Sequence, residues 1–287
     1  MEDVKMAKRT VATLLEMKKN GQKVSQVTCY DYSTMCLIEQ CGIDTVLVGD
    51  SLGMTMQGHD TTLPVTMEDM IVYGKSVVRG SKEAFVVMDM PFMSYQVSVE
   101  QAVMNAGRLI KETGANAVKL EGGAAVKEQI KAIVDAGIPV CAHIGMTPQS
   151  VNVFGGFKVQ GKGEANAERV LQDALAVQEA GAFMCVLECV PPKLAALITE
   201  KVDMVTIGIG AGAGCDGQVL VWQDLTGVNQ DFTPKFAKHF GEIGEAMKAA
   251  FRAYNAEVKG GTFPAEEHSF VKSDCGDGFL EGLRAKY

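Results

Sequence analysis

Residues 45–54 read Thr45-Val46-Leu47-Val48-Gly49-Asp50-Ser51-Leu52-Gly53-Met54, and this stretch decides the fold. Three of its first four residues are β-branched, which suits a short strand that is buried on both faces. A carboxylate and a hydroxyl follow directly after Gly49. In parallel α/β proteins such strand ends gather at one edge of the sheet, where ligands bind. Asp50 is therefore the first candidate site residue.

The same pattern repeats along the chain: a glycine that ends a helix, an apolar run, and a polar residue where the run stops. The glycines are Gly42, Gly114, Gly137 and Gly181, and the stops are Asp50, Glu121, His143 and Glu188. This order is typical of repeated αβ units. Asp89 ends a further run of this kind. We expect eight strands, at 24–28, 45–48, 84–88, 117–120, 138–142, 183–187, 202–207 and 218–222.

Eight strands in a chain of 287 residues favour an α/β fold of the (β/α)8 TIM barrel type, preceded by an N-terminal helix over residues 6–19. A doubly wound open sheet is the alternative. We expect residues 1–270 to form a single barrel domain and residues 271–287 a C-terminal tail. Apolar residues at helical spacing predict a last helix over 234–258, with an aromatic face able to pack on the barrel or on a neighbour.

Composition excludes several functional classes. The chain is 47% hydrophobic and 22% charged, and its net charge of -8 disfavours binding to nucleic acid. It contains no run of about 18 apolar residues, so we expect no membrane span. Its eight cysteines include no C-x-x-C pair, which favours reduced thiols over a zinc site. We therefore expect a cytoplasmic protein that acts on small molecules.

In a barrel, the polar strand ends would meet at one mouth. Carboxylates from Asp50, Asp89 and Glu121 would form a hard, oxygen-rich site that suits Mg²⁺. Lys119 lies two residues before Glu121 and so points to the same side of its strand. It is expected either to neutralise a substrate carboxylate or to pair with Glu121.

Three further residues of this mouth have more than one interpretation. Glu188, from a different strand, is a candidate general base. His143 is either a hydrogen-bonded structural residue or a support for the groups that hold the ligands. Ser51 either caps a turn or binds substrate.

Several longer motifs resemble the 3-methyl-2-oxobutanoate hydroxymethyltransferase (ketopantoate hydroxymethyltransferase) family. They are Val48–Met54, Gln57–Asp60, Thr62–Thr66, Val118–Gly123, His143–Ser150, Leu187–Pro191, Gly208–Gly212 and Asp216–Gln218. The resemblance runs from about residue 10 to about residue 270. It implies a (β/α)8 barrel of the phosphoenolpyruvate/pyruvate superfamily and, for the assembly, a homodecamer.

The resemblance also implies an activity. The family transfers a hydroxymethyl group from 5,10-methylenetetrahydrofolate to 3-methyl-2-oxobutanoate through a Mg-stabilised enolate, giving 2-dehydropantoate and tetrahydrofolate for pantothenate and coenzyme A biosynthesis. By residue match, Asp50, Asp89 and Glu121 would hold Mg²⁺. Asp50, Ser51, Asp89 and Lys119 would hold the 2-oxo acid, and Glu188 would accept the proton.

The chain departs from the family pattern at three places. Tyr73 stands where a histidine is expected, residues 213–215 fill the glycine loop unusually, and the tail after Phe270 is extra. These departures leave the folate and assembly contacts open. Two other functions also stay open: a Mg²⁺-dependent C–C lyase or mutase that uses no folate, and a barrel that binds or assembles without catalysis.

Overall fold

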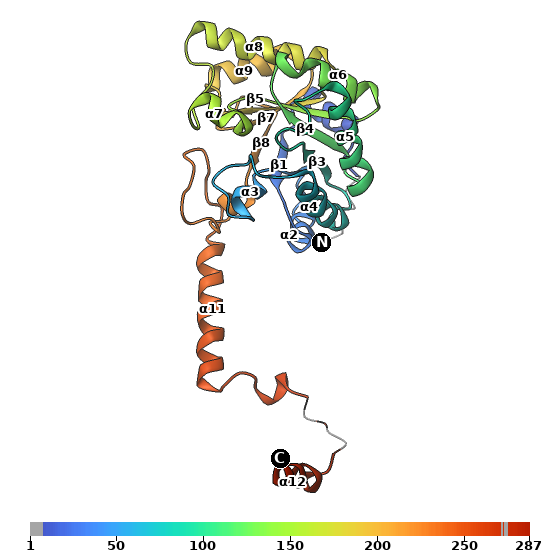
Figure 1. Ribbon diagram of the computed structural model, residues 1–287. Helices are drawn as coiled ribbons and strands as arrows, with labels where there is room; N and C mark the ends of the chain where they lie inside the picture. The colour runs from blue at the N-terminus through green and yellow to red at the C-terminus, as the bar shows by residue number, and fades with distance from the viewer. Residues whose placement is uncertain (1–7, 271, 273–274) are drawn as a thin grey trace.

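The computed structural model describes residues 8–270, 272 and 275–287, and its eight parallel strands form a closed barrel in chain order (Figure 1). The strands are β1 (Val24–Thr28), β2 (Thr45–Val48), β3 (Phe85–Asp89), β4 (Ala117–Glu121), β5 (Val140–Gly145), β6 (Met184–Glu188), β7 (Val205–Ile209) and β8 (Gly217–Leu220). Because β1 pairs with β8, the sheet is closed, which confirms the predicted barrel and excludes the open sheet. Among the described helices, none is long and apolar enough to cross a membrane.

Helices follow six of the strands and cover the outside of the barrel. They are α2 (Tyr32–Glu39), α4 (Met67–Gly80), α5 (Val99–Thr113), α6 (Lys127–Asp135), α8 (Glu164–Glu179) and α9 (Pro192–Lys201). Short helices lie in the connections: α3 (Leu52–Thr55), η1 (Ala124–Val126), η2 (Pro148–Ser150), α7 (Val151–Phe154) and α10 (Trp222–Leu225). The remaining helices are α1 (Val11–Lys19), α11 (Ile243–Gly260), η3 (Glu266–His268) and α12 (Asp277–Lys286).

The N-terminal helix closes one end of the barrel. Leu14 of α1 is fully buried in the same apolar cluster as Val24 and Val205 from inside the barrel. In that cluster the rings of Phe85 and Phe183 meet edge to face at 5.6 Å. The predicted helix over residues 6–19 begins at Val11, and residues 6 and 7 lie outside the described residues. Apolar packing thus fills this end and leaves the opposite end for polar side chains.

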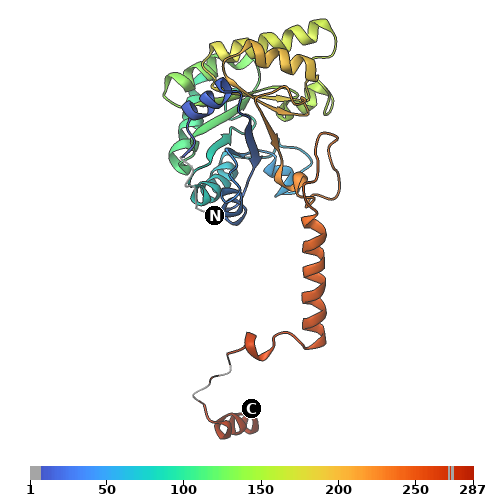
Figure 2. The same ribbon diagram turned by 180° about the vertical axis from the view of Figure 1, so that it is seen from behind.

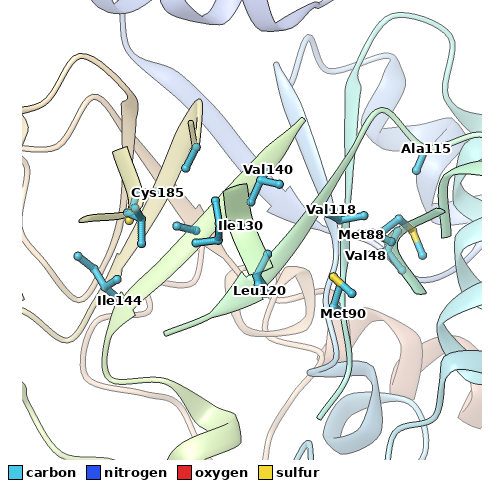
Figure 3. Close-up of a cluster of buried hydrophobic side chains, with 14 of the residues drawn as sticks. Val48, Met88, Met90, Ala115, Val118, Leu120, Ile130, Val140, Ile144 and Cys185 are labelled. Atoms are coloured by element: carbon cyan, nitrogen blue, oxygen red, sulfur yellow. The ribbon is translucent and has the colours of Figure 1, made fainter. Parts of the chain in front are cut away.

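A second apolar layer lies between the strands and the helices (Figure 3). Val118 and Leu120 of β4 face this layer, where Ile130 of α6 is buried. Because successive strand residues point to opposite faces, their neighbours Lys119 and Glu121 face the inside of the barrel. The same alternation turns the last polar residues of β3, β5 and β6 inward.

The last long helix differs from the prediction. It begins at Ile243, whereas residues 234–242 form turns in which the Phe240 N–H donates to the Leu225 carbonyl at 2.7 Å. Pro234 and Gly241 are poor helix formers, so helical spacing of the apolar residues there does not produce a helix. Figures 1 and 2 show α11 projecting away from the barrel. Of the two predicted alternatives, packing of this helix on its own barrel is therefore wrong.

No helix joins β7 to β8, and the outer side of β1 and β8 is correspondingly open. A hollow of about 380 Å³ lies there, lined by Lys23, Ser25, Asp44 and Gln218 among others. Another, of about 650 Å³, lies between α1 and α9. Neither hollow contains a predicted site residue.

Candidate active site

Four neighbouring strands bring the predicted site residues together. In the strand register, Asp89 of β3 lies beside Lys119 of β4, and Glu121 lies beside His143 of β5. Glu188 ends the next strand, β6. All of these residues except Glu188 are at most 5% exposed. The side chains therefore converge at one mouth, as the sequence predicts.

Asp50 and Ser51 reach the same mouth from the turn after β2. The Asp50 N–H donates to Asp89 Oδ2 at 3.0 Å, which links the two acids directly. A Cβ at Gly49 would lie 2.8 Å from Ser51 Oγ and 3.4 Å from Asp89 Oδ2, so glycine allows this close approach. The Ser51 hydroxyl lies 2.8 Å from the hydroxyl of the fully buried Tyr30. This contact fixes the position of the Ser51 hydroxyl.

Lys119 is the one buried lysine or arginine in the part of the chain that the structure describes. Its Nζ lies 2.7 Å from Asp89 Oδ1, so its ion pair is with Asp89 rather than with Glu121. Burial acts to lower the pKa of Lys119, but the charges of Asp89, Glu121 and Asp50 outweigh it and raise the pKa above its ordinary value. Lys119 is therefore a fixed positive charge at the centre of the mouth.

His143 connects this lysine to Glu188. Its Nδ1 lies 3.3 Å from Lys119 Nζ, and its Nε2 lies 3.1 Å from Glu188 Oε2. An ammonium group only donates, so Nδ1 accepts and Nε2 carries the ring proton, close to Glu188 Oε2 but without the alignment of a hydrogen bond. Burial, reinforced by Lys119, lowers the pKa of His143, which keeps the ring neutral. The geometry suits a histidine that orients the carboxylate of Glu188.

The mouth holds more negative than positive charge. Burial, with the charges of Asp89 and Glu121, raises the pKa of Asp50 well above its ordinary value. Burial likewise raises the pKa of Glu121 to about 7, and Glu121 Oε1 has no hydrogen-bond donor. These carboxylates therefore fit a hard cation, which would compensate their charge.

The chain alone does not form a closed metal shell. In residues 8–270, 272 and 275–287, no group of three or more His, Cys, Asp or Glu side chains could hold a metal ion. A cation at this mouth would need further oxygen ligands from water or substrate. Mg²⁺ typically binds in this way, through one or two carboxylates and several other oxygens. The ligand roles of Asp50, Asp89 and Glu121 thus stay a prediction.

Sequence reasoning missed two residues at the centre of the site, Gln149 and Tyr95. The buried Gln149 side chain donates to Asp50 Oδ2 at 2.9 Å, and its backbone N–H donates to Glu121 Oε2 at 2.9 Å. The Tyr95 hydroxyl donates to Gln149 Oε1 at 2.6 Å. Both lie in connections between strands and helices, where no periodicity marks them. The available signal was the position of Gln149 inside the motif His143–Ser150.

Comparison with known proteins identifies the relatives of this chain. A sequence profile of the family described as "Ketopantoate hydroxymethyltransferase" matches residues 8–266. The 3-methyl-2-oxobutanoate hydroxymethyltransferase of Clostridium novyi (strain NT) is 63% identical over 263 residues, which covers 92% of this chain and 96% of that protein. That of Enterococcus faecalis (strain ATCC 700802 / V583) is 58% identical over 267 residues and covers 93% and 97%.

Solved structures agree with the fold. The phosphoenolpyruvate phosphomutase of Streptomyces platensis subsp. rosaceus has a TM-score of 0.61 and 15% identity, covering 97% of this chain and 96% of that one. This likeness confirms the predicted type of barrel. At this level of identity it concerns the fold alone.

Proposed function

Since this chain belongs to the ketopantoate hydroxymethyltransferase family, we propose that it transfers a hydroxymethyl group from 5,10-methylenetetrahydrofolate to 3-methyl-2-oxobutanoate. The products would be 2-dehydropantoate and tetrahydrofolate, as in the biosynthesis of pantothenate and coenzyme A. One structural observation supports this proposal most. Four acids and one lysine, from β3, β4, β6 and the turn after β2, converge at the open mouth of the barrel, beside a histidine of β5 that lies close to Glu188.

The chain's own residues can bind and orient a 2-oxo acid. Lys119 offers a permanent positive charge to a carboxylate or a keto oxygen. The Ser51 hydroxyl, held by Tyr30, can donate to the same group. Asp50 and Asp89, joined by a backbone hydrogen bond, border the same space. Substrate would thus lie over β2 to β4, with its C3 atom directed toward β6.

Glu188 is the proposed proton acceptor. In the proposed reaction the C3–H bond breaks, its proton goes to the Glu188 carboxylate, and the electron pair left on C3 forms the new bond to the methylene carbon. Both bonds from that carbon to the folate nitrogens break, water supplies the hydroxyl group, and the two nitrogens take the remaining proton of water and the proton held by Glu188, which gives tetrahydrofolate. His143 Nε2, 3.1 Å from Glu188 Oε2, holds the carboxylate in one orientation. The carbonyl of Glu188 also accepts the Met146 N–H at 2.9 Å, which fixes the backbone at this strand end.

We propose Mg²⁺ as the cofactor, near Asp50, Asp89 and Glu121. When bound, it would supply positive charge for the oxygen that becomes negative as the proton leaves. The excess of buried carboxylate over lysine supports this assignment. The long segment between β5 and α8, which begins at this mouth, is the proposed cover over both substrates.

Exchange of the C3 proton in deuterated water tests the proposed base. We expect Glu188→Gln to bind 3-methyl-2-oxobutanoate in calorimetry but to lose deuterium incorporation at C3, measured by NMR. The matched control is Glu179→Gln, the same change at an exposed glutamate of α8, which should exchange normally. Normal exchange in Glu188→Gln would remove Glu188 from this role. Turnover without the folate would instead favour a lyase or mutase.

The assembly and the location of the protein also belong to this proposal. We propose a homo-oligomer, with the decamer of the family resemblance as the expected form. Support comes from α11, whose apolar side chains Ile243, Met247, Phe251 and Tyr254 are each at least 41% exposed. A cytoplasmic location, expected from the cysteine content, stays a prediction.

A further inference from the structure

One amide side chain at the barrel mouth contacts more elements of the site than any predicted residue does. Gln149 Nε2 donates to Asp50 Oδ2 and to the Met90 carbonyl, each at 2.9 Å. Its backbone N–H donates to Glu121 Oε2 at 2.9 Å. One residue therefore binds two of the carboxylates that are expected to hold the cation. Gln149 is 7% exposed, so water does not replace these contacts readily.

The surroundings of Gln149 fix the orientation of its amide. Oε1 accepts from the Tyr95 hydroxyl at 2.6 Å and from Gln96 Nε2 at 3.2 Å. The opposite end, Nε2, faces two acceptors, a carboxylate and a carbonyl. A flipped amide would place oxygen against both acceptors and NH₂ against the Gln96 donor. The amide therefore has one favourable orientation, and that orientation directs its N–H groups at Asp50.

Tyr95 extends the same network to the backbone of β4. Its hydroxyl accepts the Glu121 N–H at 3.1 Å, and the residue is 1% exposed. Gln149 and Tyr95 thus hold Glu121 at its carboxylate and at its backbone. Asp50 follows β2 and Glu121 ends β4, and these two strands are not neighbours in the sheet. No hydrogen bond between paired strands therefore fixes the distance between Asp50 and Glu121, whereas Gln149 contacts both residues.

From these contacts we infer that Gln149 is a positioning residue, which holds Asp50 and Glu121 at the separation and orientation that a divalent cation requires. The inference rests on the proposed function, because it assumes that these acids face the cation. Gln149 also lies in η2, at the start of the segment from β5 to α8. The same hydrogen bonds therefore attach the proposed cover of the active site to its acids.

Metal affinity is the readout that separates positioning from a merely structural role. We would titrate Mn²⁺ into the full-length protein, with 3-methyl-2-oxobutanoate present, and follow free Mn²⁺ by EPR. Gln149→Met keeps the length of the side chain and the backbone N–H that contacts Glu121, and it removes the side-chain hydrogen bonds to Asp50 and to the Met90 carbonyl. The expected result is a loss of Mn²⁺ affinity of about 10- to 100-fold, the usual effect of removing a group that orients a metal ligand. In steady-state kinetics the Mg²⁺ concentration for half-maximal rate should rise by a similar factor.

Gln172→Met is the matched control. Gln172 is an exposed glutamine on α8, so the same change there leaves every contact of Gln149 in place. We expect its Mn²⁺ affinity to equal that of the unmodified protein. The thermal unfolding midpoint of each metal-free variant shows that the proteins compared are folded.

The possible outcomes decide different questions. A folded Gln149→Met protein with unchanged Mn²⁺ affinity would overturn the inference while leaving the proposed function intact. Absence of Mn²⁺ binding in the unmodified protein would contradict the proposed cofactor instead. If Gln149→Met does not fold, Tyr95→Phe decides the matter, since it removes the hydroxyl that orients the amide. We expect weaker Mn²⁺ binding in that variant, and unchanged binding would overturn the inference.

Discussion

Lys119 and Asp89 form an ion pair of 2.7 Å between neighbouring strands, and each side chain is 4% exposed. The pair is the positive centre of a mouth that otherwise holds carboxylates. Asp89 uses its second oxygen to accept the N–H of Asp50, so the pair also fixes the turn after β2. Lys119 therefore contributes to the stability of the metal-free protein, and in the proposed function it also binds the anionic substrate.

Lys119→Met tests this double role. Removal of one partner from a buried ion pair leaves the other charge uncompensated, which typically costs about 3–5 kcal/mol of unfolding free energy. We expect a loss of this size at neutral pH in urea denaturation of the metal-free protein. Lys127→Met is the control, because Lys127 pairs with an exposed Glu179 carboxylate at 2.8 Å. That surface pair should contribute about 0–1 kcal/mol. Equal losses in both variants would contradict the assigned role of Lys119.

The raised pKa of Glu121 predicts a pH dependence of stability. In the folded protein its pKa is about 7, against an ordinary 4.5, because the side chain is buried. Between these values the folded state keeps a proton that the unfolded state releases, so stability attributable to Glu121 falls as pH rises. We therefore expect the thermal unfolding midpoint of the metal-free wild-type protein to fall, relative to that of Glu121→Gln, as pH rises from 4.5 to about 7. A difference that does not change with pH would contradict the prediction.

His143 should act on the rate and not on substrate binding. His143→Leu removes the ring whose Nε2 lies 3.1 Å from Glu188 Oε2 and leaves in place the side chains that are proposed to hold the 2-oxo acid. A base displaced by about 1 Å loses about 10²-fold in rate. We expect C3 exchange to slow by about that factor while the calorimetric affinity for the 2-oxo acid is kept. If the variant instead lost affinity for the 2-oxo acid but exchanged C3 protons at the normal rate once the acid was bound, His143 would have a role in substrate binding.

The exposed face of α11 predicts the effect of surface charge on assembly. Phe251 is 64% exposed and Met247 is 41% exposed, although both belong to an apolar face. If a second copy covers this face, glutamate at both positions should lower the molar mass measured by light scattering. Ala249→Glu is the control, because helical spacing places Ala249 on the opposite side of the helix. An unchanged mass in the double variant would exclude this face from the interface.

The barrel and the convergence of its acids were predictable from sequence for one physical reason. Strand residues alternate between two faces, so a polar residue at the end of an apolar run must point into the barrel mouth when its neighbours pack outside. Asp89, Glu121, His143 and Glu188 all follow this rule. The same alternation did not predict the ion-pair partner of Lys119. Its partner is Asp89, which lies beside it on the neighbouring strand, and not Glu121 on its own strand.

Loops and the last helix could not be predicted in the same way. Gln149 and Tyr95 lie in segments without period, and only the folded chain brings them to Asp50 and Glu121. At residues 234–242 the apolar spacing continued that of α11, but Pro234 and Gly241 prevented a helix. The amphipathic spacing of α11 supports the proposed oligomer, but it does not identify the surface that would cover this face.

The anomalous scattering of Mn²⁺ in a crystal soaked with 3-methyl-2-oxobutanoate would test the central claim most directly. The claim is that one cation and one 2-oxo acid share the mouth formed by β2 to β6. We predict a single strong peak within coordination distance of at least one oxygen of Asp50, Asp89 or Glu121, with the 2-oxo acid bound to it beside Lys119. A bound 2-oxo acid with no Mn²⁺ peak at this mouth, or a peak only at surface acids, would contradict the claim.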